Sequence, residues 1–263
     1  MDPADLVDQS FGPYPFFVSP AQVGEFISVT RDLHHRWKEA APPGFMAAAL
    51  FVVAPELLSQ LEGRSVIHGE QSFTWMRALE VGATLAVSGK VTRSRERGGV
   101  HFTTFDIEVS DGEEVVATGS SLFLISGEET PARTDRERPE PAHDDRGSGA
   151  DDMVAASRAD LIHYAAATGD WNPIHWDHDA AVAAGMPGVV VHGLLQAAWA
   201  LRTATMPTVG QSPLIRARIR FRNPLLPADP AEVHSEWTDN DVNIRLMGGD
   251  QTYITARVEF ADE

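Results

Sequence analysis

The side chains best suited to acid–base chemistry lie in one short stretch of the C-terminal half. Asp170, Asn172 and His175 bring together a carboxylate, a carboxamide and an imidazole. Gly169 precedes them and Pro173 lies among them, which predicts a loop rather than a helix. A carboxylate and an imidazole can handle protons near neutral pH, and an amide can orient a water or a neighbouring side chain. We therefore expect this loop to carry catalysis.

A structural interpretation of the same loop has to be weighed against the catalytic one. Asp and Asn beside Gly and Pro often do no more than form a turn, and Asp170-Trp171-Asn172-Pro173 alone would be interpreted in that way. The presence of His175, and of the run Val189-Val190-Val191-His192-Gly193 that follows, favours a functional loop.

Gly193 stands at the predicted start of a buried helix. A helix N-terminus offers unpaired backbone N–H groups and the positive end of the helix dipole. Because Gly193 has no Cβ, a ligand carbonyl can approach its backbone closely, which suits binding of a thioester enolate oxygen. Tight helix packing is the structural alternative for Gly193, and we favour the functional one. For His192 we favour a structural role, as a buried histidine bonded to backbone.

Helices are predicted on either side of this loop and again in the N-terminal half. Pro20 follows the candidate N-cap Ser19, and Ser157 with Asp160 resembles a capping box that opens a helix ending at Gly169. Its apolar positions fall on one face: Leu161, Tyr164, Ala165 and Thr168. A further helix, rich in Ala and Leu nearly all round and hence buried, is expected over residues 193–205.

Strands follow the helices in both halves, and the two sets look related. Alternation of apolar and polar residues predicts strands over residues 84–92, 100–109, 114–125, 232–238, 242–246 and 253–260. Hairpin turns are expected at residues 98–99, 111–112 and 248–250. Before these strands, Phe73 and Trp75 of one half correspond to Ile219 and Phe221 of the other, as Leu79 does to Leu225.

The chain is therefore predicted to hold two similar halves joined by a linker. We expect an N-terminal half over 1–126, a linker over 127–152 that is rich in Pro, Gly and charge, and a catalytic half over 153–263. A long helix wrapped by an antiparallel sheet is an α+β arrangement, and two copies would form a pseudo-dimer within one chain.

Composition limits the partners and the compartment. The formal net charge of −17 argues against nucleic acid, and the absence of Cys excludes disulfides, a thiolate nucleophile and Cys-ligated zinc. No apolar run is long enough to span a bilayer, and the acidic start is unlike a signal peptide, so a soluble cytoplasmic protein is expected.

The loop and the run after it resemble a known signature. Residues 168–175 and 185–194 look like the signature of the MaoC-like dehydratases and (R)-specific enoyl-CoA hydratases, which are hotdog-fold proteins. The Arg220–Asp229 segment resembles their first long strand and turn, and Ile67–Phe73 resembles the N-terminal hotdog of two-hotdog members more weakly. The resemblance implies a double hotdog fold.

It also implies a reaction and the residues that carry it. Asp170 and His175 would form the acid–base pair, with Asn172 supporting their geometry and the Gly193 N–H binding the thioester oxygen. The reaction would be reversible syn hydration of a trans-2-enoyl-CoA to the (R)-3-hydroxyacyl-CoA, without a cofactor or a metal. The expected partner is an acyl-CoA or acyl-carrier-protein thioester, and two chains can pair as a homodimer.

The first half departs from this pattern, because it has no Asp-x-Asn-x-x-His motif. We predict that it has lost catalysis and helps to shape the acyl tunnel, although core packing is the stronger interpretation for its candidate lining residues Phe16, Phe17, Phe45, Met46 and Phe51. Arg31, His34, His35 and Arg36 could form a basic patch that binds phosphates, but we favour the interpretation that they form a solvated face.

Four alternatives remain open on the sequence. The enzyme could be a 3-hydroxyacyl-carrier-protein dehydratase, or a hydratase of a branched or dicarboxylic acyl-CoA. It could hydrolyse thioesters, since that chemistry occurs on the same fold. It could be a non-catalytic acyl-thioester-binding partner subunit, against which the complete Asp170, Asn172 and His175 set argues. A metal site is the weakest alternative, built from His163, Asp170, His175, Asp177, His178 and His192.

Overall fold

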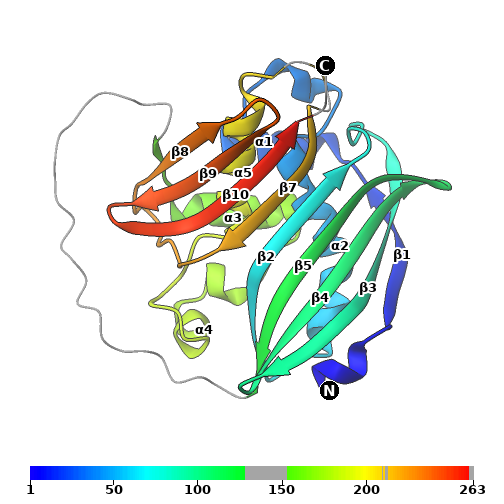
Figure 1. The fold of residues 1–263 in the computed structure, drawn as a ribbon, viewed down its shortest axis with the longest axis vertical. Coiled ribbons are helices and arrows are strands. Elements are labelled where there is room, and N and C mark those ends of the chain that lie inside the picture. The colour runs from blue at the N-terminus through cyan, green and yellow to red at the C-terminus, as the bar shows by residue number, and fades with distance from the viewer. Residues whose placement is uncertain (128–152, 209, 211–212, 261–263) are drawn as a thin grey trace.

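The computed structural model describes residues 1–127, 153–208, 210 and 213–260. Within these ranges ten strands form one antiparallel sheet, with the helices behind it in the view of Figure 1. The predicted linker 127–152 lies outside the described residues except for Gly127. No helix of the described part of the chain has both the length and the apolar character to cross a bilayer.

The first half supplies five strands and two α-helices. In chain order these are β1 (Ser10–Phe17), α1 (Pro20–Thr30), α2 (Met46–Ser59), β2 (Ser65–Trp75), β3 (Thr84–Arg97), β4 (Val100–Asp111) and β5 (Glu114–Ser126). Short 3₁₀ helices lie between them: η1 (Pro3–Leu6), η2 (His35–Lys38) and η3 (Pro43–Phe45).

The second half repeats this order. Its elements are β6 (Met153–Val154), α3 (Arg158–Thr168), η4 (Pro173–His175), α4 (His178–Ala183), α5 (Gly193–Thr205), β7 (Leu214–Phe221), β8 (Ala231–Trp237), β9 (Asp241–Gly248) and β10 (Gln251–Phe260). The predicted helix over 193–205 is confirmed, and the predicted hairpin turns connect β3 to β4, β4 to β5 and β9 to β10. β1, β6 and α4 were not predicted.

The two halves join in the middle of the sheet. The strand order is β1-β3-β4-β5-β2-β7-β10-β9-β8-β6, so β2 and β7 are the neighbours that connect the halves. They run antiparallel with Ser72 opposite Arg218, which is where a two-fold axis relating Phe73 to Ile219 would pass. The correspondence deduced from the sequence therefore fits the register of the sheet.

The buried helices α2 and α5 fill the concave side of the sheet. α5 packs on β7 to β10, and α2 packs on β1 and β3. Most residues of both helices are buried, since apolar side chains surround each axis and leave no polar face for solvent. α1 and α3 pack on each other across the boundary between the halves, and they lead into the two loops compared below. The predicted α+β class is confirmed.

Candidate active site

Local sequence rules fix the helix that delivers the candidate loop. The side chain of Ser157 accepts a hydrogen bond from the Asp160 N–H, and Asp160 accepts one from the Ser157 N–H, so the predicted capping box is present. At the other end Gly169 adopts the left-handed conformation with φ 83°, which a residue without Cβ tolerates. The chain therefore leaves α3 abruptly at Asp170.

Asn172 shapes the loop from a solvent-exposed position. Its side-chain oxygen accepts a hydrogen bond from the Ile174 N–H at 3.3 Å and caps the 3₁₀ turn η4. Its own N–H donates to Oδ1 of Asp170 at 3.4 Å. The turn-forming interpretation of Asn172 therefore describes its side-chain contact, while its backbone N–H donates to Asp170 and its carbonyl oxygen accepts from the His175 N–H at 3.1 Å. Its catalytic support role stays a prediction.

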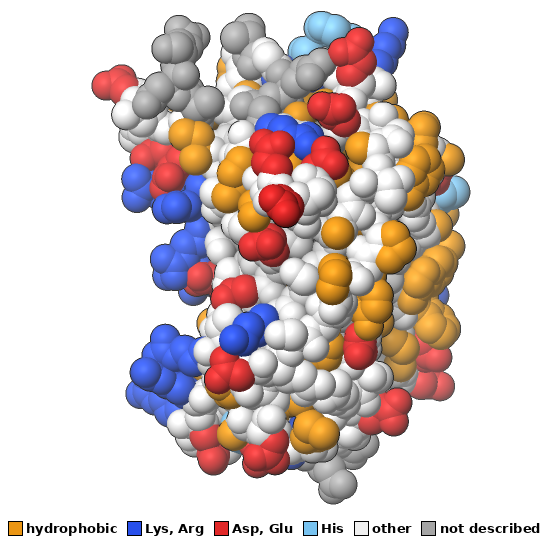
Figure 2. Space-filling model, turned by 90° about the vertical axis from the view of Figure 1, so that its right-hand side faces the viewer, with side chains coloured by type: hydrophobic (Ala, Val, Ile, Leu, Met, Phe, Trp, Pro, Cys, Tyr) orange, Lys and Arg blue, Asp and Glu red, His pale blue; other side chains and the backbone are white. Residues whose placement is uncertain are grey.

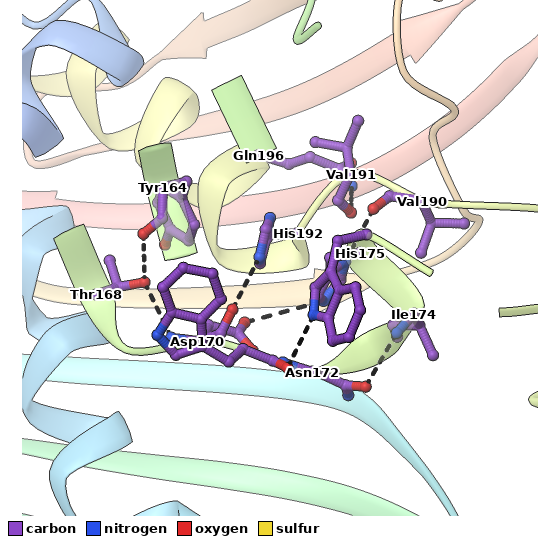
Figure 3. A network of polar contacts seen from close by, with 12 residues as sticks. Tyr164, Thr168, Asp170, Asn172, Ile174, His175, Val190, Val191, His192 and Gln196 are labelled. Atoms are coloured by element: carbon purple, nitrogen blue, oxygen red, sulfur yellow. Dashed lines mark hydrogen bonds and ion pairs between the residues drawn. The ribbon is translucent and has the colours of Figure 1, made fainter. Parts of the chain in front are cut away.

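Asp170 and His175 come together in the interior (Figure 3). Asp170 is 6% exposed and His175 is 7% exposed, and Oδ2 of Asp170 lies 3.9 Å from Nε2 of His175. That separation is an ion-pair contact and is too long for a direct hydrogen bond. Burial raises the pKa of Asp170, while the charge of His175 and the Asn172 N–H oppose that rise.

The tautomer of His175 follows from its other contact. Nδ1 of His175 lies 2.8 Å from the carbonyl oxygen of Val190, which can only accept a hydrogen bond. Nδ1 therefore carries the hydrogen, and the neutral ring presents the lone pair of Nε2 on the side of Asp170. A buried carboxyl group with a raised pKa and a bare imidazole nitrogen form a pair able to give and take protons.

Gly193 occupies the first position of α5, directly after His192, whose ring stacks on that of His175. No side chain caps this helix N-terminus among the described residues. A Cβ on Gly193 would lie 2.9 Å from a ring carbon of Phe221, so any larger residue here would displace that ring. Both interpretations of Gly193 thus have support: its absent side chain accommodates Phe221, and its helix end remains a polar site for an oxyanion.

The N-terminal half reaches the site through α2. A Cβ on Gly169 would contact the Cβ of Phe51 at 3.5 Å, so Phe51 lies beside the start of the loop. The other candidate lining residues differ in burial. Phe16, Phe45 and Met46 belong to the core, in agreement with the packing interpretation, whereas Phe17 is 52% exposed and lines no interior surface.

The basic-patch hypothesis is wrong for Arg36. This residue is buried, and its guanidinium donates hydrogen bonds to the carbonyl oxygens of Thr205, Thr208 and Gly210. The favoured solvated-face interpretation is also wrong for Arg36, although Arg31 and His35 are exposed. Arg36 is committed to the C-terminal end of α5, where a cation is favoured by the helix dipole.

Three residues of the described chain could offer ligand atoms to a metal. Atoms of Asp170, His175 and His192 lie within 4.8 Å of one another. The rings of His175 and His192, however, stack with centroids 3.8 Å apart and an interplanar angle of 24°. Lone pairs in two nearly parallel planes do not converge on one ion, so the arrangement fits a tetrahedral metal poorly. Of the other candidates, His163 contacts Glu25 instead.

A separate hollow lies on the outer face of the sheet. It encloses about 820 Å³, and both acidic and basic side chains line it, among them Glu70, Lys90, Asp106, Arg216 and Arg218. Figure 2 shows Lys and Arg side chains gathered along one side of the molecule. The hollow has neither an imidazole nor a helix N-terminus in its lining, so we do not assign acid–base chemistry to it.

Comparison with family models supports the resemblance drawn from the loop. Residues 140–257 match the model of the MaoC-like domain, and residues 25–118 match that of the FAS1-like dehydratase domain region. The two matches fall in different halves of the chain. The second half is thus similar to MaoC-like domains over nearly its full length, including the candidate loop.

Similar proteins were found along the whole chain. The 3-hydroxyacyl-thioester dehydratase X of Mycobacterium tuberculosis is 28% identical over 92% of this chain and 85% of its own length. The peroxisomal multifunctional enzyme type 2 of Drosophila melanogaster is 23% identical over 86% of this chain, which spans only 41% of that enzyme.

Solved structures share the fold. The crystal structure of HtdX from M. tuberculosis has a TM-score of 0.72 at 24% identity and covers 96% of this chain and all of that one. A second M. tuberculosis protein, described as having a double hotdog fold, has a TM-score of 0.65 at 13% identity and covers 97% and 96% of the two chains. The predicted double hotdog fold is therefore confirmed.

Proposed function

Because the second half is similar to MaoC-like domains and the described part of the chain has a double hotdog fold, we propose that the protein is an acyl-thioester hydro-lyase. The proposed reaction is reversible syn addition of water to a trans-2-enoyl-CoA, which gives the (R)-3-hydroxyacyl-CoA. Residues 153–263 would form the catalytic domain and residues 1–126 a non-catalytic one. The observation that carries the proposal is the buried contact of 3.9 Å between Asp170 and His175.

The proposed chemistry balances without a cofactor. Overall, water adds its hydroxyl to C3 and a hydrogen to C2. One group of the Asp170–His175 pair accepts a proton from the attacking water, and the pair donates a proton to C2. Asp170 and His175 lie 3.9 Å apart, and both proton transfers are assigned to this pair. Negative charge that develops on the thioester oxygen would be stabilised by the Gly193 N–H at the start of α5.

The names of similar proteins favour the same class of substrate. The mycobacterial relative is named a 3-hydroxyacyl-thioester dehydratase, and dehydration is the reverse of the proposed hydration. CoA as the handle is the finer part of the proposal. A carrier-protein thioester would use the same site and differ only in what the protein contacts outside the acyl group.

The test is a spectrophotometric assay of the purified protein at the enone absorption band, with crotonyl-CoA and with a longer enoyl-CoA. Loss of absorbance, absent in the folded His175→Ala variant, with an (R)-3-hydroxy product, is the expected result. Release of free thiol would instead identify a thioesterase. No reaction with CoA thioesters but turnover of the matching carrier-protein thioesters would overturn the choice of handle.

A further inference from the structure

His192 is completely buried between two other rings of the site. Its imidazole stacks on that of His175 at 3.8 Å, and the ring of Tyr164 lies on its other side with centroids 4.8 Å apart (Figure 3). Stacking against a fixed ring restricts how His175 can rotate about its side-chain bonds. The described residues also give the His175 ring a hydrogen bond from Nδ1 to Val190 and the longer contact of Nε2 with Asp170, so the stack adds a further constraint on the same ring.

The same imidazole also contacts the backbone of Asp170. Nε2 of His192 lies 3.2 Å from the carbonyl oxygen of Asp170, and because a carbonyl only accepts, Nε2 carries the hydrogen and donates it. Nδ1 is then the unprotonated nitrogen, and it has no hydrogen-bond partner among the described residues. One buried ring thus contacts both members of the acid–base pair.

His192 is in addition the residue immediately before Gly193. It takes the N-cap position of α5, with φ −51° and ψ 131°, so its backbone sets the direction in which the helix starts. The three groups to which the proposed function gives a role are Asp170, His175 and the Gly193 N–H. His192 is bonded to, stacked on or adjacent in the chain to each of them.

Resting on the proposed function, we propose that His192 is a positioning residue for the hydration reaction. Its ring fixes the distance between the carboxyl group of Asp170 and the imidazole of His175, and it holds both in register with the helix N-terminus. It transfers no proton itself, since its hydrogen is committed to the Asp170 carbonyl. His192 thus connects the N-terminus of α5 to Asp170 and His175.

The electrostatics of His192 suit this passive role. Burial lowers the pKa of His192 well below its ordinary value, and the neighbouring charge of His175 lowers it further, while the contact with the Asp170 carbonyl opposes the change. The ring therefore stays neutral and adds no charge beside the imidazole of His175. A neutral neighbour can remain stacked on a cationic imidazole without like-charge repulsion.

Two substitutions separate the hydrogen bond from the stack. His192→Phe keeps an aromatic ring but loses the donor, and His192→Gln keeps an N–H donor but loses the ring. Each is expected to lower kcat by about 10–100-fold with KM changed by less than about threefold, because a misplaced catalytic group costs turnover rather than binding. His234→Phe and His234→Gln are the matched controls, since they make the same two changes at an exposed histidine on β8, outside the site, and should leave kcat within twofold.

A spectroscopic measurement makes the test independent of the substrate. Long-range ¹⁵N–¹H spectra of the histidine rings report which nitrogen of His175 carries hydrogen, with His175→Ala giving the assignment. We expect a wild-type spectrum with His175 protonated at Nδ1, and in His192→Phe a mixture of tautomers or broadened signals. Folded variants with kcat within twofold of wild type and an unchanged His175 spectrum would overturn the role of His192. A wild-type protein that turns over no enoyl thioester would overturn the proposed function alone.

Discussion

The loops that follow α1 and α3 begin with the same backbone conformation but differ in a side chain that decides what chemistry each loop can support. Each follows one helix of the α1–α3 pair, and each starts from a left-handed residue, Arg31 with φ 56° and Gly169 with φ 83°. Each then buries an aspartate, Asp32 or Asp170, and both are 6% exposed. Burial raises the pKa of both carboxyl groups.

The next positions of the two loops also correspond. Asn172 and His34 each cap a 3₁₀ turn by accepting a hydrogen bond from the N–H two residues ahead, at 3.3 Å and 3.2 Å. The loops differ three residues after this cap. The second has His175, whereas the first has Trp37, whose indole N–H donates to Oδ1 of Asp32 at 2.7 Å.

That one ring changes what the buried carboxyl group can do. An indole N–H donates a hydrogen bond but has no nitrogen lone pair to accept a proton, whereas an imidazole does both. The Asp32–Trp37 contact is therefore a static hydrogen bond. With Arg36 bonded to the C-terminal end of α5, the first loop holds a buried helix of the other half. A buried aspartate alone does not make an acid–base site.

The largest expected effect comes from disabling the second loop. Asp170→Asn and His175→Ala should each lower turnover by about 10²–10⁴-fold, the contribution of an acid–base group. Asp32→Asn is the matched control, since it changes an equally buried aspartate and should leave turnover within about twofold. Steady-state rates with an enoyl-CoA, on variants with unaltered circular dichroism, test this. A loss of turnover in Asp32→Asn as large as in Asp170→Asn would contradict the difference between the loops.

The second prediction concerns the hydrogen bonds that Arg36 donates at the C-terminal end of α5. Arg36→Met should reduce the free energy of unfolding by about 3 kcal/mol, because the carbonyl oxygens of Thr205, Thr208 and Gly210 lose hydrogen bonds to a charged donor. Lys38→Met is the control, since Lys38 lies in the same 3₁₀ turn but is exposed. Urea denaturation measures both. Equal urea midpoints for Arg36→Met and Lys38→Met would show that Arg36 does not stabilise the packing of the two halves.

A smaller loss is expected at Trp37. Trp37→Phe keeps an aromatic ring and removes the N–H that Asp32 accepts, which should cost about 1–3 kcal/mol of folding free energy, since a buried acceptor loses its partner. Turnover per folded molecule should stay near that of the wild type. Thermal unfolding with parallel activity measurements is the test, and lost turnover without lost stability would assign the first loop a part in catalysis.

The smallest effect is a pH dependence that belongs to Asp32. Because its pKa is raised above the ordinary value of 3.8, both states carry the proton below that value. As pH rises, the unfolded chain ionises first, so stability falls until the pH passes the raised pKa and then levels off. Asp32→Asn still accepts from Trp37 and should flatten this slope, whereas Asp239→Asn, at an exposed position, should not. An identical slope of stability against pH in the wild type, Asp32→Asn and Asp239→Asn would contradict the assignment of this pH dependence to Asp32.

Much of the site could be predicted from the sequence because its signals are local. The capping box at Ser157, the Gly169 terminus and the start of α5 at Gly193 depend on residues a few positions apart. The spacing of Asp32, His34 and Trp37 repeats that of Asp170, Asn172 and His175, so the counterpart loop was visible in the sequence. Because Trp37 stands where the motif has His, the sequence predicted that this half has lost catalysis, but not that Trp37 donates a hydrogen bond to Asp32.

Contacts between distant segments could not be predicted in this way. The stack of His192 on His175, and the contact of Phe221 with Gly193, depend on how α5, η4 and β7 pack. The fate of Arg36 was also unpredictable, since its partners lie on α5 and beyond in the other half. A charged residue in a polar run is usually exposed, and only tertiary packing buried this one.

The sequence by itself thus determined the helix ends, the alternating strands and the residue types of the candidate loop, because each is set by backbone geometry and near neighbours. The tertiary structure alone decided the order of the ten strands, the burial that raises the pKa of Asp170, and the stacking of His192 on His175. These depend on which surfaces exclude water together, and exclusion of water is a property of the packed chain rather than of any one segment.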